Sequence, residues 1–375
     1  MMGKERWVWF AGLVLIIVIG IFFPPEAKSE TVIGMIGPMT GEGAQAGTNM
    51  RDAVTLGIDE INARGGIKGE KLKLVVVDDE GNPTKSINGN NRLVYNEKAI
   101  VVIGSVQSTC TLANMAVTEK AGVPQITSTS TSPAITQKGN KWIFRTAATD
   151  AIQAENIVKI AINTLGKRRL AVINVSTDYG RDGTKVLLAI CNKMGISPVA
   201  VESFTQGDKD FSSQLLKIKE QNPDTLIIWS MYEEAALIAK QVAQMGLKIQ
   251  LMGGGGLTNS KYVELGGPVT YGTIMCQTYH PSSKDPVIAG FTERFQKKFG
   301  RLPDPNAAQS YDAIQIVIAA LEKAGAKDRS KIRDAIAATH DFKGVTGNIR
   351  FDNTGDAPRD MMIIQIGDGK YELYK

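Results

Sequence analysis

The stretch TVIGMIGPMTGEGAQAGTNMRDAVTLGIDEINARGGIKGEKLKLVVV, residues 31–77, changes its periodicity twice. Residues 31–37 are rich in β-branched and apolar side chains, which predicts a strand, and residues 72–77 predict a second strand. Between them, apolar residues recur at helical spacing: Met50, Val54, Ile58 and Ile61. A strand, a helix and a strand in this order predict a parallel βαβ unit, because the crossover helix returns the chain to the same end of the sheet.

The same alternation continues along the chain and restarts after Asp150, which is placed as the N-cap of a helix. Further strands are expected at residues 100–103, 123–127, 170–175, 225–229 and 249–252. A chain of 375 residues is too long for one ordinary core. The sequence therefore predicts an α/β protein with two doubly wound parallel-sheet lobes.

The N-terminal segment predicts export. Lys4 and Arg6 precede an unbroken apolar run at residues 7–23, and small residues around Ser29 offer an exit from it. This is the pattern of a secretory signal peptide, so we expect residues 1–29 to be removed after Ser29 and the mature protein to be periplasmic. The alternative is an uncleaved membrane anchor, because 17 apolar residues lie near the lower length limit of a spanning helix.

Composition argues against several classes of protein. Basic and acidic residues are interspersed and the net charge is only +5, so no nucleic-acid partner is expected. Cys110, Cys191 and Cys276 are far apart and are expected to be buried free thiols, and with two histidines no metal site is expected. Motifs of hydrolases such as GxSxG and HExxH are absent from the sequence. We therefore expect a protein that is not an enzyme and has no cofactor.

A glycine-rich segment after the first strand, GEGAQAG at residues 41–47, is close to a dinucleotide-binding fingerprint. Its last gap is one residue too long. The acids Asp78 and Asp79 also follow the glycines by more than 30 residues, whereas the fingerprint expects about 20. The segment is therefore interpreted as an ordinary strand-to-helix turn.

Two hydroxyl-rich loops follow neighbouring strands, GSVQST at residues 104–109 and TSTSTSP at residues 127–133. Ligands of such sheets bind at the carboxyl ends of the strands, where a helix N-terminus can hold a carboxylate without a formal cation. The alternative is that these loops only cap helices and turn the chain.

The segment INARGGIKGEKLKLVVVDDEGNP at residues 61–83 resembles a signature of the periplasmic branched-chain amino-acid binding proteins of ABC transporters. Further matches are IGPMTG at 36–41, RTAATD at 145–150, DYG at 178–180, GDKDFSSQLLKIK at 207–219 and QMGLKIQLMG at 244–253. The resemblance implies the type I periplasmic binding fold, in which a three-strand hinge joins two lobes around a cleft. Lobe one is expected to comprise residues 30–149 and 279–350, and lobe two residues 150–278 and 351–375.

The resemblance also implies a function and a set of binding residues. The protein is expected to be a monomer that captures a small carboxylate-bearing ligand, an amino acid, for an inner-membrane ABC permease. Ser108 and Thr131 would donate hydrogen bonds to the ligand carboxylate, Thr129 would help through its backbone, and Tyr179 of lobe two would close over the ligand. Gln107, beside Ser108, is expected in the same site.

This chain departs from the family pattern in the rest of the pocket. Gly255 stands where leucine-binding members hold the ligand ammonium with an acid, and Ala46 stands where an aromatic residue covers the side-chain pocket. Met231 stands in place of a tyrosine, with Tyr232 beside it. A disulfide of some relatives is absent, because Gly81 and Gln107 occupy its positions.

These departures leave the ligand open. A buried ammonium without a partner is costly, so either another acid pairs with it or the ligand lacks an amine. Asp150, Glu233 and Glu234 are the candidate acids, although a solvated helix start is the favoured interpretation of the two glutamates. The alternatives are a binding protein for an amine-free organic acid and a ligand-presenting partner of a sensor.

Overall fold

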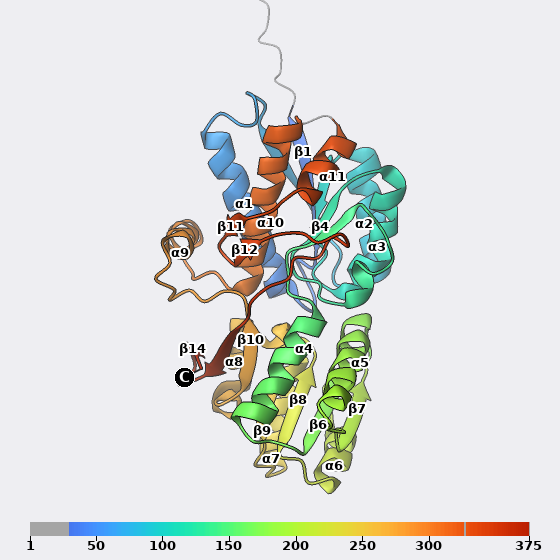
Figure 1. Cartoon of the computed structure of the whole chain (residues 1–375), viewed down its shortest axis with the longest axis vertical. Helices are drawn as coiled ribbons and strands as arrows, with labels where there is room; N and C mark the ends of the chain where they lie inside the picture. The colour runs from blue at the N-terminus through green and yellow to red at the C-terminus, as the bar shows by residue number, and fades with distance from the viewer. Residues whose placement is uncertain (1–29, 326–327, 375) are drawn as a thin grey trace, which may run out of the picture.

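The computed structural model describes residues 30–325 and 328–374 and contains two α/β lobes stacked end to end (Figure 1). The first lobe is built on a five-stranded parallel sheet in the order β2-β1-β3-β4-β5. Its strands are β1 (Thr31–Gly37), β2 (Leu72–Asp78), β3 (Val101–Ile103), β4 (Gln125–Thr127) and β5 (Ile143–Arg145).

Helices cover both faces of this sheet, and the alternation within β1 shows why. Ile33 and Met35 belong to one core with the helices α1 and α10, whereas Ile36 belongs to a core on the opposite face, which Val32 also contacts. Successive side chains of a strand point to opposite faces, so each face needs its own layer of helices. The helices of this lobe are α1 (Ala44–Ala63), α2 (Pro83–Asn91), α3 (Ser108–Ala121), α9 (Pro286–Phe299), α10 (Pro305–Ala324) and α11 (Arg329–Ala337).

The second lobe is built on a seven-stranded sheet in the order β14-β13-β10-β9-β8-β6-β7. Five of its strands are parallel, and the C-terminal hairpin β13–β14 adds two antiparallel strands at the edge. The strands are β6 (Leu170–Val175), β7 (Ala200–Phe204), β8 (Thr225–Trp229), β9 (Gln250–Gly253), β10 (Ile274–Gln277), β13 (Met362–Ile366) and β14 (Tyr371–Leu373). Strand β6 is buried along its whole length, as expected for a strand covered on both faces.

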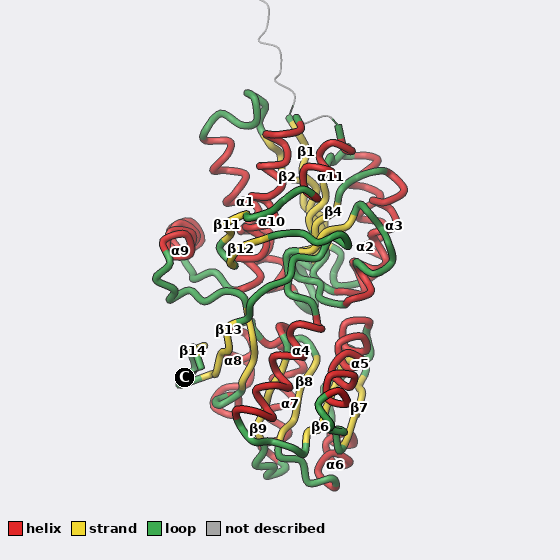
Figure 2. Tube along the Cα trace, in the orientation of Figure 1, coloured by secondary structure: helices red, strands yellow, loops and turns green. Residues whose placement is uncertain are grey.

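The helices of the second lobe also form two layers, which the tube view separates from the yellow strands (Figure 2). Helix α4 packs against α5, while α7 packs against α6 and α8. Their bounds are α4 (Asp150–Lys159), α5 (Asp178–Lys193), α6 (Ser212–Glu220), α7 (Tyr232–Gln244) and α8 (Ser260–Gly266). Strands β11 (Phe342–Gly344) and β12 (Gly347–Ile349) form a two-stranded antiparallel ladder in the first lobe, before the chain returns to the second lobe.

The chain passes between the lobes three times: after β5, after β10 and after β12. In the third passage the chain stays with the first lobe beyond residue 351, because Phe351 and Ala357 pack in the core formed with α1 and α10. We therefore propose that the last crossing lies between Ala357 and Met362, later in the chain than the sequence-based boundary at 351.

A buried cation ties this returning segment to the first lobe. The Arg145 guanidinium is 0% exposed and pairs with Asp356, with 2.7 Å between Nη2 and Oδ1. Arg145 also donates from Nη1 to the Ser132 carbonyl at 2.6 Å and from Nη2 to the Thr136 hydroxyl at 2.9 Å. One side chain thereby joins the end of β5, the loop after β4 and the third crossing segment.

The expectation of two doubly wound lobes with a three-strand hinge is confirmed. The expected signal segment, residues 1–29, lies outside the described residues. Among residues 30–325 and 328–374, no helix is long and apolar enough to cross a membrane.

Candidate functional site

A cavity lies between the lobes, where the topology of both sheets places it. In the first sheet the strand order reverses between β1 and β3, and in the second it reverses between β6 and β8. Loops that diverge at such a switch point leave a crevice outside the carboxyl ends of the strands. The cavity encloses an empty volume of about 870 Å³, part of it open to solvent.

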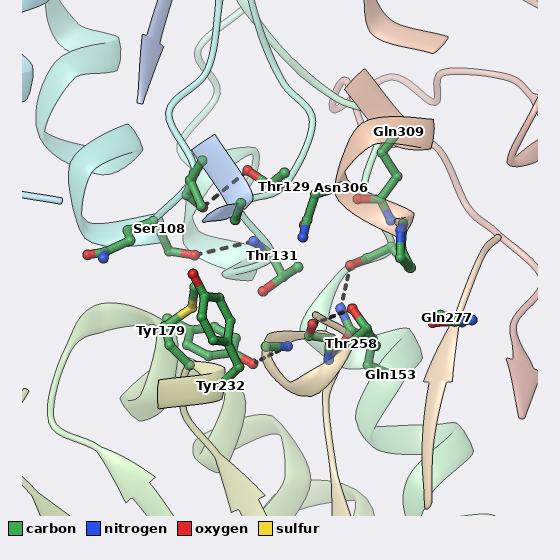
Figure 3. Close-up of a pocket in the computed structure, with 18 of the residues that line it drawn as sticks. Ser108, Thr129, Thr131, Gln153, Tyr179, Tyr232, Thr258, Gln277, Asn306 and Gln309 are labelled. Carbon is green, nitrogen blue, oxygen red and sulfur yellow. Dashed lines mark hydrogen bonds between the residues drawn. The ribbon is translucent and has the colours of Figure 1, made fainter. Parts of the chain in front are cut away.

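All nine residues expected at the site line this one cavity: Ala46, Gln107, Ser108, Thr129, Thr131, Tyr179, Met231, Tyr232 and Gly255. Figure 3 shows Ser108, Thr129 and Thr131 on the first-lobe side, with Tyr179 and Tyr232 facing them from the second lobe. The sequence pattern thus brings the correct segments together, while their roles toward a ligand stay a prediction.

Ser108 holds the loop that carries the other hydroxyls. Its Oγ accepts hydrogen bonds from the backbone N–H groups of Thr131 and Ser132, each at 3.2 Å. The Thr129 hydroxyl donates to the carbonyls of Ser105 and Val106 at 3.3 Å, so it is occupied by the backbone. Ser108 Oγ accepts both of these bonds, so its own proton remains available for an acceptor in the cavity that Ser108 lines.

Helix N-termini supply the positive electrostatic potential of the site. Helices α3, α5 and α7 all begin at the cavity, and in none of the three does the side chain of the N-cap residue accept a capping hydrogen bond. The first turn of a helix carries unpaired N–H groups and a partial positive charge of roughly half a unit. No lysine, arginine or histidine is among the described residues that line the cavity. The arrangement can therefore hold a carboxylate through dipoles and hydroxyls alone.

The second lobe closes the cavity with aromatic side chains. Tyr179 is 9% exposed and its ring lies 6.2 Å from that of Trp229, while its hydroxyl accepts from the Gly256 N–H at 3.3 Å. Burial raises the pKa of Tyr179 far above its ordinary value, so it stays a neutral hydrogen-bonding group. A side chain at Gly256 would meet the Ser230 carbonyl at 2.1 Å, which explains why glycine stands there.

The side chain of Gln153 lies beside Gly255. Its Oε1 accepts from the Gly255 N–H at 2.5 Å, and its Nε2 donates to the Ala148 carbonyl at 2.9 Å. The side chain beside Gly255, where the family resemblance implies an acid, is therefore a neutral amide that is already hydrogen-bonded.

The three candidate replacement acids do not line the cavity. Asp150 is 0% exposed, and burial raises its pKa to about 7. The Thr131 hydroxyl and the Trp229 indole N–H lower that pKa, but neither has hydrogen-bond geometry to the carboxylate. Glu234 is only 3% exposed, so the expectation of a solvated helix start is wrong for this residue. That error arose because the first-lobe loop that covers the start of α7 is distant in sequence.

An acid missed by the sequence analysis lines the cavity instead. Glu42, on the loop between β1 and α1, is the one charged residue among the described lining residues. It lies within the glycine-rich segment that was interpreted as a plain turn. Its Oε2 accepts from Gln206 Nε2 of the second lobe at 2.9 Å.

The sequence analysis also missed a group of neutral polar residues. They come from both lobes and from the segments next to the crossings: Gln153, Gln206, Thr258, Gln277, Asn306 and Gln309. Figure 3 shows Gln277 and Gln309 at the end of the cavity away from Ser108. No motif marks these residues, because each belongs to a different element that only the topology brings to the cleft.

The positions of the family disulfide are adjacent in space. A Cβ atom at Gly81 would lie 2.6 Å from Gln107 Nε2, so the glutamine side chain occupies the space that a bridge would fill. Cys110, Cys191 and Cys276 are buried free thiols, as expected.

Comparisons with known proteins agree with this geometry. A family model described as periplasmic binding protein matches residues 30–370. An amino acid binding protein of Pseudomonas aeruginosa is 31% identical over 351 residues, covering 92% of this chain and 93% of that protein.

Two solved structures share the architecture. A leucine-binding protein, LivK, from Thermotoga maritima is 30% identical and superposes with a TM-score of 0.86, covering 92% of this chain and 98% of that one. A branched-chain amino acid transporter substrate-binding protein, LivJ, from Streptococcus pneumoniae in complex with isoleucine is 27% identical, with a TM-score of 0.85, and covers 92% and 98%. The chain therefore belongs to the periplasmic binding protein family.

Proposed function

We propose that this protein is an extracytoplasmic solute-binding protein that captures an amino acid and delivers it to an inner-membrane ABC transporter. The observation that carries the proposal is the interlobe cavity, in which the start of α3 and the hydroxyls of Ser108 and Thr131 face Tyr179. The relatives named above bind leucine or isoleucine or are amino acid binding proteins, which supports the same class of ligand.

The ligand carboxylate would bind at the first lobe. Ser108 and Thr131 would each donate an O–H, and the uncapped first turn of α3 would add N–H groups. A hydrogen bond to a charged group contributes about 1.5–3 kcal/mol, so two hydroxyls account for a large part of a micromolar affinity, which corresponds to about 8 kcal/mol. The helix dipole favours the same anion.

Closure of the second lobe would complete the site. Hydrogen bonds already bridge the lobes around the cavity: Asp178 N–H donates to Thr109 Oγ1 at 3.1 Å, and Asn259 Nδ2 donates to Asp304 Oδ2 at 3.1 Å. A ligand favours the closed form only through the additional contacts that this form offers, here those of Tyr179 and the start of α7. The permease would then bind the closed outline formed by both lobes.

A ligand screen tests the proposal. Protein that has been unfolded, dialysed and refolded is heated with each protein amino acid and with a panel of organic acids. A ligand at 100 times its dissociation constant should add about 2.7 kcal/mol of stability, which appears as a raised melting temperature. Absence of a shift with every amino acid, or conversion of a ligand to product, would contradict the proposal.

Export and the monomeric state belong to the same proposal. Secretion of the full chain should yield a mature N-terminus at Glu30, read by N-terminal sequencing, and a particle of about 37 kDa in solution. Recovery of the intact N-terminus in the membrane fraction would instead favour an uncleaved anchor.

A further inference from the structure

Glu42 is held at the boundary between the lobes by partners on both sides. Gln206 of the second lobe donates to its carboxylate at 2.9 Å, and Gln107 of the first lobe donates to its backbone carbonyl at 3.4 Å. Gln206 also donates to Gln107 Oε1 at 3.4 Å. Gln206 therefore holds the Glu42 side chain at the cavity and Gln107 holds its backbone, and neither amide neutralises the carboxylate charge.

Two further acids approach Glu42 from the start of α7. Glu233 accepts from the Gly43 N–H at 3.0 Å, and Glu234 accepts from the Gly207 N–H at 3.2 Å. The other oxygen of Glu234, a residue that is 3% exposed, receives no donor from the rest of the described chain, and the interaction of the two carboxyls lowers the pKa of Glu42 and raises that of Glu234. Within residues 30–325 and 328–374, no basic side chain forms an ion pair with any of the three acids.

The three acids therefore lack a positively charged partner among the described side chains. Burial raises the pKa of Glu42, and burial together with the nearby charge of Glu42 raises the pKa of Glu234 to about 8. The N-terminus of α7 offsets part of the charge of Glu233 and Glu234, which lie in its first turn. Glu42 is not on that helix, and it is the member of the group that lines the cavity. The described residues include no group of acids, cysteines and histidines arranged to hold a metal ion.

We propose that Glu42 binds the cationic group of the ligand and takes over the role of the acid that is absent at Gly255. The inference rests on the proposed function, because it takes the ligand to be an amino acid. A zwitterion held by its carboxylate at Ser108 and Thr131 still has an ammonium that needs a partner. Glu42 is the acid that the cavity offers, and it accepts the ammonium of the α-carbon or a cation on the side chain.

Four matched six-carbon acids test this inference in the wild-type protein and in Glu42→Gln. Hexanoate has no amine, L-norleucine has the α-amine, 6-aminohexanoate has the terminal amine, and L-lysine has both. Isothermal calorimetry at pH 7.5 gives the affinity ratio between each amine-bearing acid and hexanoate. A charge-assisted contact should make at least one of these ratios about tenfold or greater.

Glu42→Gln should reduce that ratio to below about threefold and leave the affinity for hexanoate unchanged within about threefold. Glu42→Asp, which keeps the charge, should retain an intermediate ratio. Glu220→Gln, at an exposed position at the end of α6, is the matched control and should behave as wild type. A large ratio for L-norleucine would show that Glu42 binds the α-ammonium, and a large ratio for 6-aminohexanoate would show that it binds a cation on the side chain.

The preference for an amine should also decline as the pH is lowered toward 5. Protonation of Glu42, whose pKa is raised, removes its charge. Of the facing groups, Glu234, with a pKa of about 8, is already largely protonated at pH 7.5, Glu233 also has a raised pKa, and Gln107 and Gln206 do not titrate. The comparison is repeated with the tightest amino acid from the ligand screen and its deaminated counterpart.

Hexanoate binding as tightly as every amine-bearing acid would overturn the inference, and so would a ratio that survives Glu42→Gln. Either result leaves amino-acid retention intact and refutes only the role of Glu42. Failure of every amino acid in the screen to bind would refute the proposed function, and the inference with it.

Discussion

The carboxylate anchor allows two effects of neighbouring hydroxyls to be separated. Ser108 Oγ accepts two buried backbone N–H groups, from Thr131 and Ser132, whereas no residue of the described chain makes a hydrogen bond to the Thr131 hydroxyl. Ser108→Ala should therefore damage the loop as well as the binding site. Thr131→Val keeps the shape of the side chain and should act mainly on binding. Because the Thr131 hydroxyl also lowers the pKa of buried Asp150, a smaller loss of stability is expected at neutral pH.

The magnitudes follow from these contacts. A buried donor left without a partner costs about 1–3 kcal/mol, so Ser108→Ala should lower the free energy of unfolding by at least about 2 kcal/mol. Thr131→Val removes one hydrogen bond to a charged group, about 1.5–3 kcal/mol, and should weaken ligand binding by about 10- to 150-fold. Thr129→Val is the control within the same loop, because the Thr129 hydroxyl bonds to backbone carbonyls and should contribute little to affinity.

Urea unfolding followed by fluorescence measures the first effect, and calorimetry with the tightest ligand measures the second. An unchanged urea midpoint for Ser108→Ala would refute its role in holding the loop. Affinity within about twofold of wild type for Thr131→Val would refute the assignment of this hydroxyl to the carboxylate.

Three further substitutions test other parts of the structure. Asp356→Ala leaves the buried guanidinium of Arg145 without its partner and should cost about 3–5 kcal/mol in urea unfolding; a loss below about 1 kcal/mol would contradict this. Asp150→Asn removes a carboxyl whose pKa is raised to about 7, so the stability that its protonated form supports is complete below pH ~4 and is lost as pH rises through 7. The variant should gain a few kcal/mol over wild type between pH 5 and 8, and parallel pH profiles would exclude this. Gly256→Ala places a methyl group 2.1 Å from the Ser230 carbonyl and should weaken ligand binding by more than about tenfold in calorimetry. Near-wild-type affinity would show that the loop can shift to accommodate the methyl group.

The buried strands of both sheets could be predicted from sequence. The predicted strands at residues 31–37, 170–175 and 225–229 coincide with β1, β6 and β8. These strands are so apolar and rich in β-branched residues that their sequence pattern indicates a buried strand. Strands β5 and β7 were not predicted: β5 has only three residues, and most of β7 alternates between exposed and half-buried residues. The pairing of β13 with β10 requires the chain to cross back to the second lobe, and no local sequence pattern predicts that crossing.

The same distinction applies to the cavity. Ser108 and Thr131 could be predicted because they lie on loops at the carboxyl ends of adjacent strands of one sheet. Glu42 was missed although its segment was recognised, because its importance depends on Gln206 and Glu234, which are more than 160 residues away. Glu234 was misjudged for the same reason. Burial at an interface between lobes depends on both partners, and the local sequence describes only one of them.

A protein outside the cytoplasmic membrane meets the acidity and salinity of its surroundings directly. The anchor proposed here is built from hydroxyls and helix N-termini, and no basic side chain lines the cavity in the described chain. Such an anchor has no group that loses its proton at mildly alkaline pH. Its partial charges are buried between the lobes, where dissolved ions screen them far less than they screen an exposed pair. Capture of the carboxylate should therefore persist from fresh water to brine, and any sensitivity to the environment should come from Glu42.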